Sequence, residues 1–283
     1  MKQAVSAFAR RALAAGIAAF GLGMTAQAWA TPVLPSATQL TIKYTDYSSL
    51  FTPSGTIIPG TTPPSVGDVF TEIFAISSIA QAANPSNVYW ASDVTDGTQL
   101  LGVTTGLSVT SVGIGPTFPA TYAGGATTIY EVPKGTFSPG APSSALAALE
   151  AQVCPASGCP APFLTLDFVP GILPGDTTDS LSTTTTSLTA PFTGSGAADL
   201  RVTGGRFAAH LTTSGSLETD FASCAGATGA FANLCSAPGS TWPDVSNDPV
   251  TLTTRTVPEP GSAALLGLGL SVMALTLRRV RGA

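Results

Sequence analysis

Apolar and polar residues alternate in short segments along most of the chain, which is the pattern of β-strands with one buried face. The alternation is clearest where Leu40, Ile42 and Tyr44 are separated by polar residues. Further strands, rich in Thr, Val and Ile, are predicted at 66–79, 87–91, 100–105, 107–112, 127–132, 164–168, 199–202, 207–211 and 250–254. Gly, Pro, Asn and Asp separate these segments, as expected for turns between strands. The series indicates an all-β domain, a sandwich or a barrel, and we expect a β-sandwich or a jelly roll.

One short helix is predicted, at residues 144–153. Pro142 precedes it, and alanines and leucines give it an apolar face. Gly204 and Gly205 predict a hairpin turn before the strand at 207–211. The strands and the helix all fall within residues 31–256, a length that suits one β domain with long loops.

The first 30 residues have the pattern of a secretory signal peptide. Basic residues precede an apolar stretch at 12–24, which is too short to span a bilayer. A motif of two small residues around one large residue ends at Ala30, so we expect cleavage between Ala30 and Thr31. The alternative is an uncleaved anchor helix.

A second apolar run, from Ser262 to Leu277, is predicted as a transmembrane helix. At about 1.5 Å per residue it is shorter than the hydrocarbon core of about 30 Å, and flanking arginines can close the gap by snorkelling. Arg278, Arg279 and Arg281 follow it directly, and the positive-inside rule keeps them in the cytoplasm. We therefore expect a precursor anchored in the inner membrane with its β domain outside. A buried core helix is the alternative.

The motif Pro258, Glu259 and Pro260 stands just before this run. Pro-Glu-Pro, an apolar helix and an arginine cluster, in this order at the C-terminus, resemble the PEP-CTERM sorting signal of Gram-negative bacteria. The resemblance covers residues 257–283. It implies that an exosortase, a membrane protease-transpeptidase, cleaves the chain near the motif. The prolines keep this stretch extended, which suits a protease cleft.

Two internal stretches, 67–107 and 194–205, contain short sequence segments that are similar to segments of PEP-CTERM proteins associated with flocculation. This resemblance implies a surface or matrix protein of cells that form flocs or biofilms. Its expected partners are the exosortase, the inner membrane before processing, and extracellular polysaccharide or other matrix proteins. The mature protein would then lie at the cell surface or outside the cell.

Composition agrees with an exported acidic domain. Charged residues make up 10% of the chain, against about 25% in ordinary soluble domains. Fifteen of the 16 acidic residues but only five of the 11 basic residues lie within 31–256. This balance excludes a nucleic-acid binder, which needs a basic patch.

Four cysteines occur as two close pairs, Cys154 with Cys159 and Cys224 with Cys235. In an exported chain an even number of cysteines indicates disulfides, and local pairing is the simplest of the three connectivities. A four-cysteine zinc site is the alternative, but the spacings exceed the usual two to four residues. We predict the two local disulfides, with no metal and no cofactor.

Catalytic motifs are missing from the sequence, so we predict a non-enzymatic adhesion protein. His210 is the only histidine, and alternation places it with Arg206 on a solvated strand face. The alternative is a polysaccharide hydrolase that uses two carboxylates. Asp167, Asp199 and Glu218 are candidates for it, although nothing in the pattern selects them. A structural module without a ligand is the third hypothesis.

Acidic loops and aromatic residues are the remaining candidates for binding. The loops 93–97 and 176–179 each hold two carboxylates, which suit Ca²⁺ and which Asx turns explain equally well. Tyr89, Trp90 and Trp242 could stack on sugar rings, whereas aromatic residues of β domains more often pack in the core.

Overall fold

The computed structural model describes residues 38–92, 97–115, 117–187, 192–247 and 249–255. The predicted signal peptide, its cleavage site, the 258–260 motif and the apolar run with its arginines lie outside these residues. Among the helices of the described residues, none is both long and apolar enough to span a membrane.

The described residues form twelve strands, which belong to one sheet. Their bounds are β1 Gln39–Phe51, β2 Ile57–Ile58, β3 Val69–Gln81, β4 Asn84–Ala91, β5 Thr98–Val112, β6 Phe118–Pro133, β7 Leu164–Val169, β8 Asp179–Ser187, β9 Thr193–Gly204, β10 Leu211–Ser223, β11 Asp244–Ser246 and β12 Pro249–Thr254. The helices in the described part of the chain are α2 Leu146–Val153 and α3 Gly229–Cys235, with a 3₁₀ turn at Ala208–His210. The all-β class predicted from the sequence is confirmed.

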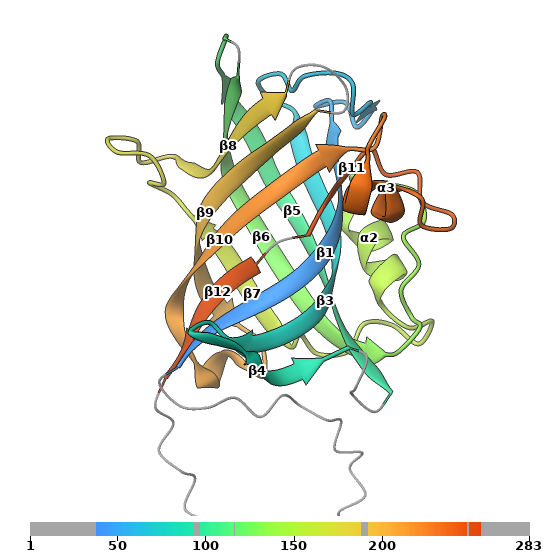
Figure 1. Cartoon of the computed structure of the whole chain (residues 1–283), viewed down its shortest axis with the longest axis vertical. Helices are drawn as coiled ribbons and strands as arrows, with labels where there is room; N and C mark the ends of the chain where they lie inside the picture. The colour runs from blue at the N-terminus through green and yellow to red at the C-terminus, as the bar shows by residue number, and fades with distance from the viewer. Residues whose placement is uncertain (1–37, 93–96, 116, 188–191, 248, 256–283) are drawn as a thin grey trace, which may run out of the picture. The chain divides into compact units, whose positions relative to one another are not determined.

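The sheet closes on itself, so the expectation of a sandwich or jelly roll is wrong (Figure 1). β1, β3, β5 and β6 pair in turn, and β9 pairs with β10. β7 and β8 share the position between β6 and β9, and β11 and β12 share the position between β10 and β1. These antiparallel pairings make a barrel whose wall has eight strand positions, of which two are each shared by two strands. Alternation alone does not separate the two folds, because the inner face of a sandwich and the inside of a barrel have the same period.

Long strands explain the closure. β1 and β3 have 13 residues each, β5 has 15 and β6 has 16. β-bulges interrupt their register, for example at Lys43 and Tyr44 in the pairing of β1 with β3. Bulges bend and twist a strand, which lets a long antiparallel sheet curve until its edges meet.

The predicted helix at 144–153 is confirmed as α2, but the expectation of one helix is incomplete because α3 is also present. α3 has only seven residues, too few for a helix that depends on its own propensity. A disulfide holds its last residue, Cys235, and Phe231 and Leu234 pack against a buried cluster. Tertiary contacts therefore stabilise a segment whose local pattern is weak.

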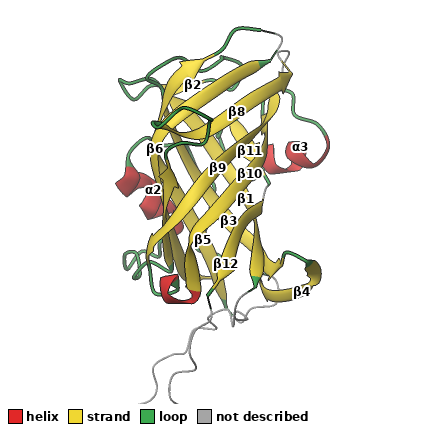
Figure 2. Ribbon diagram, turned by 90° about the vertical axis from the view of Figure 1, so that its left-hand side faces the viewer, coloured by secondary structure: helices red, strands yellow, loops and turns green. Residues whose placement is uncertain are grey.

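Apolar residues form two clusters, one inside the barrel and one outside it. The inner cluster includes Leu40, Ile42 and Leu252. The outer cluster includes Ile73 and Leu101 from the barrel wall, and α2 and α3 cover the wall from outside (Figures 1 and 2). Both faces of β3 and β5 are thus buried, which explains their nearly continuous apolar sequences.

Candidate functional site

The barrel interior contains a cavity of about 120 Å³ in the half where β1 ends and β6 begins. Apolar side chains fill the other half and leave a second space of only about 30 Å³. The segment 59–64, between β2 and β3, lines the larger cavity together with the strands. This segment crosses the end of the barrel near the top of Figure 1.

One wall of the cavity is apolar and aromatic. Its rings stand on several strands and include Tyr44, Phe70, Tyr122, Phe168 and Phe221. Phe70 and Tyr122 meet edge to face, with ring centroids 6.3 Å apart. Rings and aliphatic side chains such as Leu181 therefore provide most of the contact surface for a bound molecule.

The wall formed by β1, β3 and β11 also carries polar residues, which these three neighbouring strands place at one level. Glu72 of β3 pairs with Ser48 of β1, and Ser48 pairs with Asp244 of β11. Asp244 also pairs with Ser223 of β10. Directly paired residues point to the same face of a sheet, and Glu72, Ser48 and Asp244 all line the cavity.

A second acidic residue lies diagonally next to Asp244. Asp46 of β1 pairs with Ser246 of β11, two residues along the strand from Asp244. Both Asp46 and Ser246 line the cavity. Diagonal neighbours lie about 7–8 Å apart, so the two carboxyl groups influence each other.

The cavity is electrostatically negative. Burial, and to a smaller extent the charge of Asp46, raise the pKa of Asp244 from 3.8 to about 7. Burial raises the pKa of Tyr122 to about 12; a hydrogen bond with Thr183 opposes this shift, and the charge of Asp244 adds to it. Among the described residues that line the cavity, none is lysine, arginine or histidine.

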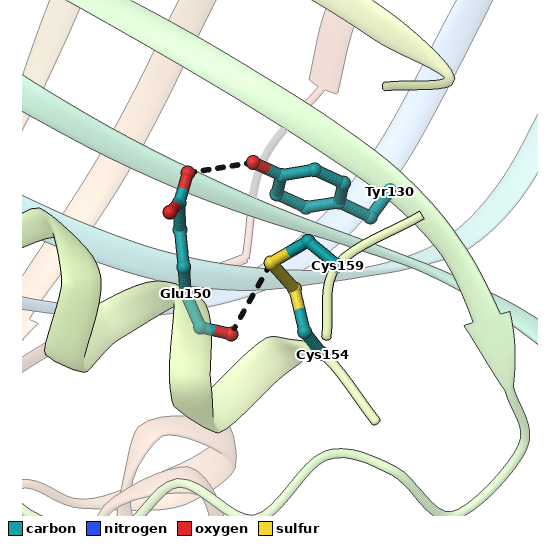
Figure 3. The surroundings of a disulfide bond; sticks show 4 residues. All are labelled: Tyr130, Glu150, Cys154 and Cys159. Atoms are coloured by element: carbon teal, nitrogen blue, oxygen red, sulfur yellow. Dashed lines mark hydrogen bonds between the residues drawn. A yellow bond between two sulfur atoms is a disulfide. The ribbon is translucent and has the colours of Figure 1, made fainter. Parts of the chain in front are cut away.

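The two predicted disulfides are present, and neither lies in the cavity lining. Cys154–Cys159 follows the end of α2, where the Tyr130 hydroxyl donates a hydrogen bond of 2.6 Å to the Glu150 carboxylate (Figure 3). Cys159 Sγ lies 3.9 Å from the Glu150 carbonyl oxygen. The Tyr130–Glu150 hydrogen bond joins α2 to β6, and the disulfide links the end of α2 to the loop that leads to β7; neither contributes to the cavity lining.

The prediction that His210 lies on a strand is wrong, although its predicted exposure to solvent is confirmed. His210 ends the 3₁₀ turn at the closed end of the barrel, and its ring centroid lies 4.8 Å from that of Phe207. Gly205 causes this turn: its φ is +96°, and a Cβ there would lie 2.5 Å from Leu164 Cα. Arg206 forms an ion pair with the buried Glu131. These residues close the barrel far from the cavity.

The carboxylates proposed for a hydrolase do not form a site. Asp199 and Glu218 are exposed on the outer face of the barrel. Asp167 is partly exposed and pairs with Arg201 at 3.4 Å. Among the described residues, no group of three or more possible ligands is placed to hold a metal ion.

The 176–179 loop is an Asx turn. The backbone N–H groups of Thr178 and Asp179 donate to the Asp176 carboxylate at 2.6 Å and 3.1 Å. These hydrogen bonds hold the pKa of Asp176 far below its usual range. Part of the other acidic loop, residues 93–96, lies outside the described residues.

The aromatic candidates for sugar stacking are mainly core residues. Trp90 and Trp242 are each 3% exposed. The Trp242 indole N–H donates to the Pro139 carbonyl oxygen at 2.6 Å, and Tyr89 packs against the inner cluster. These contacts give the rings structural roles.

The sequence interpretation missed the three acidic residues of the cavity. A signal was available for two of them, because Asp46 continues the inward alternation of Ile42 and Tyr44, and Glu72 interrupts a long apolar run. For Asp244 no local pattern was informative, since β11 has three residues. Only the strand register brings Asp244 next to the other two.

No protein-family model and no curated protein matches the chain, so the chemistry of the cavity is the guide to function. An eight-position barrel is wide enough to hold one small ligand. A mostly apolar lining with a few convergent polar groups is typical of small-molecule sites.

Proposed function

We propose that the chain is an exported surface or matrix protein whose barrel binds a small, largely apolar organic molecule. The observation that carries this proposal is the unfilled space of about 120 Å³ inside an otherwise packed barrel. For comparison, an engineered apolar cavity of about 150 Å³ in another protein binds benzene. The polar wall would orient the ligand.

A cavity-filling variant tests the proposal. Ala120 of β6 is buried and lines the cavity, so Ala120→Phe should fill part of it and weaken binding of a benzene-sized probe at least tenfold. Ala126→Phe is the matched control, because Ala126 lies on the same strand and is exposed. Equal probe affinity in the wild type and Ala120→Phe, measured by NMR titration, would refute the proposal.

Export and sorting form the second part of the proposal. The C-terminal resemblance supports processing by an exosortase, and two disulfides support an oxidising compartment outside the cytoplasm. Replacing Pro258, Glu259 and Pro260 with alanines should block processing and leave membrane insertion intact. Immunoblots of membrane and culture fractions measure this. Normal processing of the alanine variant would contradict the sorting assignment.

The biological role that we propose is non-enzymatic, in flocculation, biofilm formation or adhesion. The internal resemblance at 67–107 and 194–205 supports it. Deletion of the gene should abolish flocculation while leaving the polysaccharide intact. Complementation with Ala120→Phe would then show whether the role depends on the cavity.

A hydrolase is the second candidate, because the cavity combines three carboxyl groups with aromatic rings. In this case Asp244, with its raised pKa, would act as the acid, and Asp46 would be the second carboxylate. A panel of ester and glycoside substrates tests it. Turnover that is lost in Asp244→Asn and retained in His210→Ala would favour the hydrolase over the binding protein.

A further inference from the structure

We infer that the molecule bound in the cavity is an organic cation, a small protonated amine whose ammonium group contacts Asp244 and whose apolar body meets the aromatic wall. This inference rests on the proposed small-molecule binding and specifies the chemistry of its ligand. The proposed small-molecule binding rests on the volume of the cavity, whereas the inference of a cation rests on the charge of the cavity lining.

The first argument is the position of Asp244. Its side chain lines the cavity, and no residue that the structure describes donates a hydrogen bond to its carboxylate. A carboxylate removed from bulk water needs a charged or hydrogen-bonding partner. The described lining offers no basic side chain. A ligand that carries an ammonium group would supply both the opposite charge and the N–H donors.

The second argument is the surrounding negative potential. Asp46 and Asp244 are diagonal neighbours on β1 and β11, and Glu72 stands at the same level as Asp244, one strand beyond Ser48. Three acidic groups on one wall favour a cation over a neutral or anionic ligand. An anion would meet like charges on this wall in a medium of low dielectric.

The third argument is the aromatic ring next to the acids. Phe221 of β10 pairs with Ser246 and is therefore the diagonal neighbour of Asp244 on β11, and both residues line the cavity. An ammonium group between them would contact the Asp244 carboxylate on one side and the Phe221 ring on the other. Ring faces attract cations, more strongly when the site is desolvated.

The segment 59–64 covers this corner of the cavity. Gly60 lies so close to β11 that a Cβ on it would be 2.7 Å from the Pro243 carbonyl oxygen and 3.1 Å from Asp244 Oδ1. The backbone at Gly60 therefore packs directly over the Asp244 carboxylate. This cover limits access of bulk water to the carboxylate. A positively charged group would therefore contact the carboxylate from the cavity.

The experiment compares two probes of nearly equal size, benzylamine and benzyl alcohol, by calorimetric or NMR titration at pH 8. We expect the wild type to bind benzylamine at least tenfold more tightly. Asp244→Asn should weaken benzylamine binding at least tenfold and leave benzyl alcohol binding within twofold. Asp199→Asn is the matched control, because Asp199 is exposed on the outer wall; it should change neither affinity.

A measurement on the wild type alone covers the case in which Asp244→Asn fails to fold. Benzylamine affinity should fall at least fivefold from pH 8 to pH 5 as Asp244 takes up a proton, while benzyl alcohol affinity stays constant. Tyr44, Asp46, Glu72 and Tyr122 are the other titratable groups that line the cavity around Asp244. Asp46→Asn and Glu72→Gln therefore accompany this titration, and the pH dependence should persist in both.

The outcomes separate the two proposals. If benzyl alcohol binds as tightly as benzylamine and the affinities are independent of pH and of Asp244, the inference of a cation is wrong and the small-molecule role stands. If neither probe binds the wild type, or if Ala120→Phe binds both probes unchanged, the cavity is not a binding site and both proposals fail.

Discussion

Asp244 makes the stability of the barrel depend on pH, and Asp244→Asn should remove that dependence. Burial raises the pKa of this carboxyl group from 3.8 to about 7 in the folded protein. The folded state therefore binds the proton more tightly than the unfolded state, and the free energy of unfolding falls as pH rises between these two values. A difference of about three pH units, at about 1.4 kcal/mol each, corresponds to about 4 kcal/mol.

Urea denaturation at pH 4, 6 and 8, with the disulfides oxidised, measures the effect. The free energy of unfolding of Asp244→Asn minus that of the wild type should grow by about 4 kcal/mol from pH 4 to pH 8. Other groups titrate in both proteins, so their contribution cancels in this difference. Parallel curves for the two proteins would show that the carboxyl group titrates normally and that burial does not raise its pKa.

Three further variants test the packing. Gly102→Ala should destabilise the fold by about 1–3 kcal/mol, because the new Cβ would lie 2.0 Å from the Phe74 ring; an unchanged melting curve would contradict this packing. Leu149→Ala should cost about 2–5 kcal/mol, since Leu149 of α2 is fully buried; a loss below 1 kcal/mol would mean that α2 is only loosely docked. Replacing Cys224 and Cys235 with alanines should lower the free energy of unfolding by about 3 kcal/mol relative to the oxidised wild type; equal stability of the two oxidised proteins would contradict this.

Local features of the chain were predictable because they depend on neighbouring residues. The alternation of Leu40, Ile42 and Tyr44 determines a strand with one inward face, and proline before an alanine- and leucine-rich stretch determines the start of α2. Cys154 and Cys159 are close enough in sequence that local pairing is the simplest connectivity. None of these inferences needs information about distant parts of the chain.

The acidic cavity depends on distant parts of the chain. Asp46, Glu72 and Asp244 come from three strands, and their meeting requires the register of β1 with β3 and with β11. The same applies to the barrel itself, whose closure is the pairing of β1 with the last two strands.

The sequence by itself determined that this is an all-β protein with two local disulfides, and it predicts targeting segments at both ends. The tertiary structure alone decided that the sheet is a barrel, that His210 lies at its closed end, and that a negative cavity occupies the other half. The physical reason is that strand periodicity and turns are set by local sterics and hydrogen bonding. Closure and register are set by the pairing of residues more than 200 positions apart, such as Gln39 with Thr253, which local patterns do not encode.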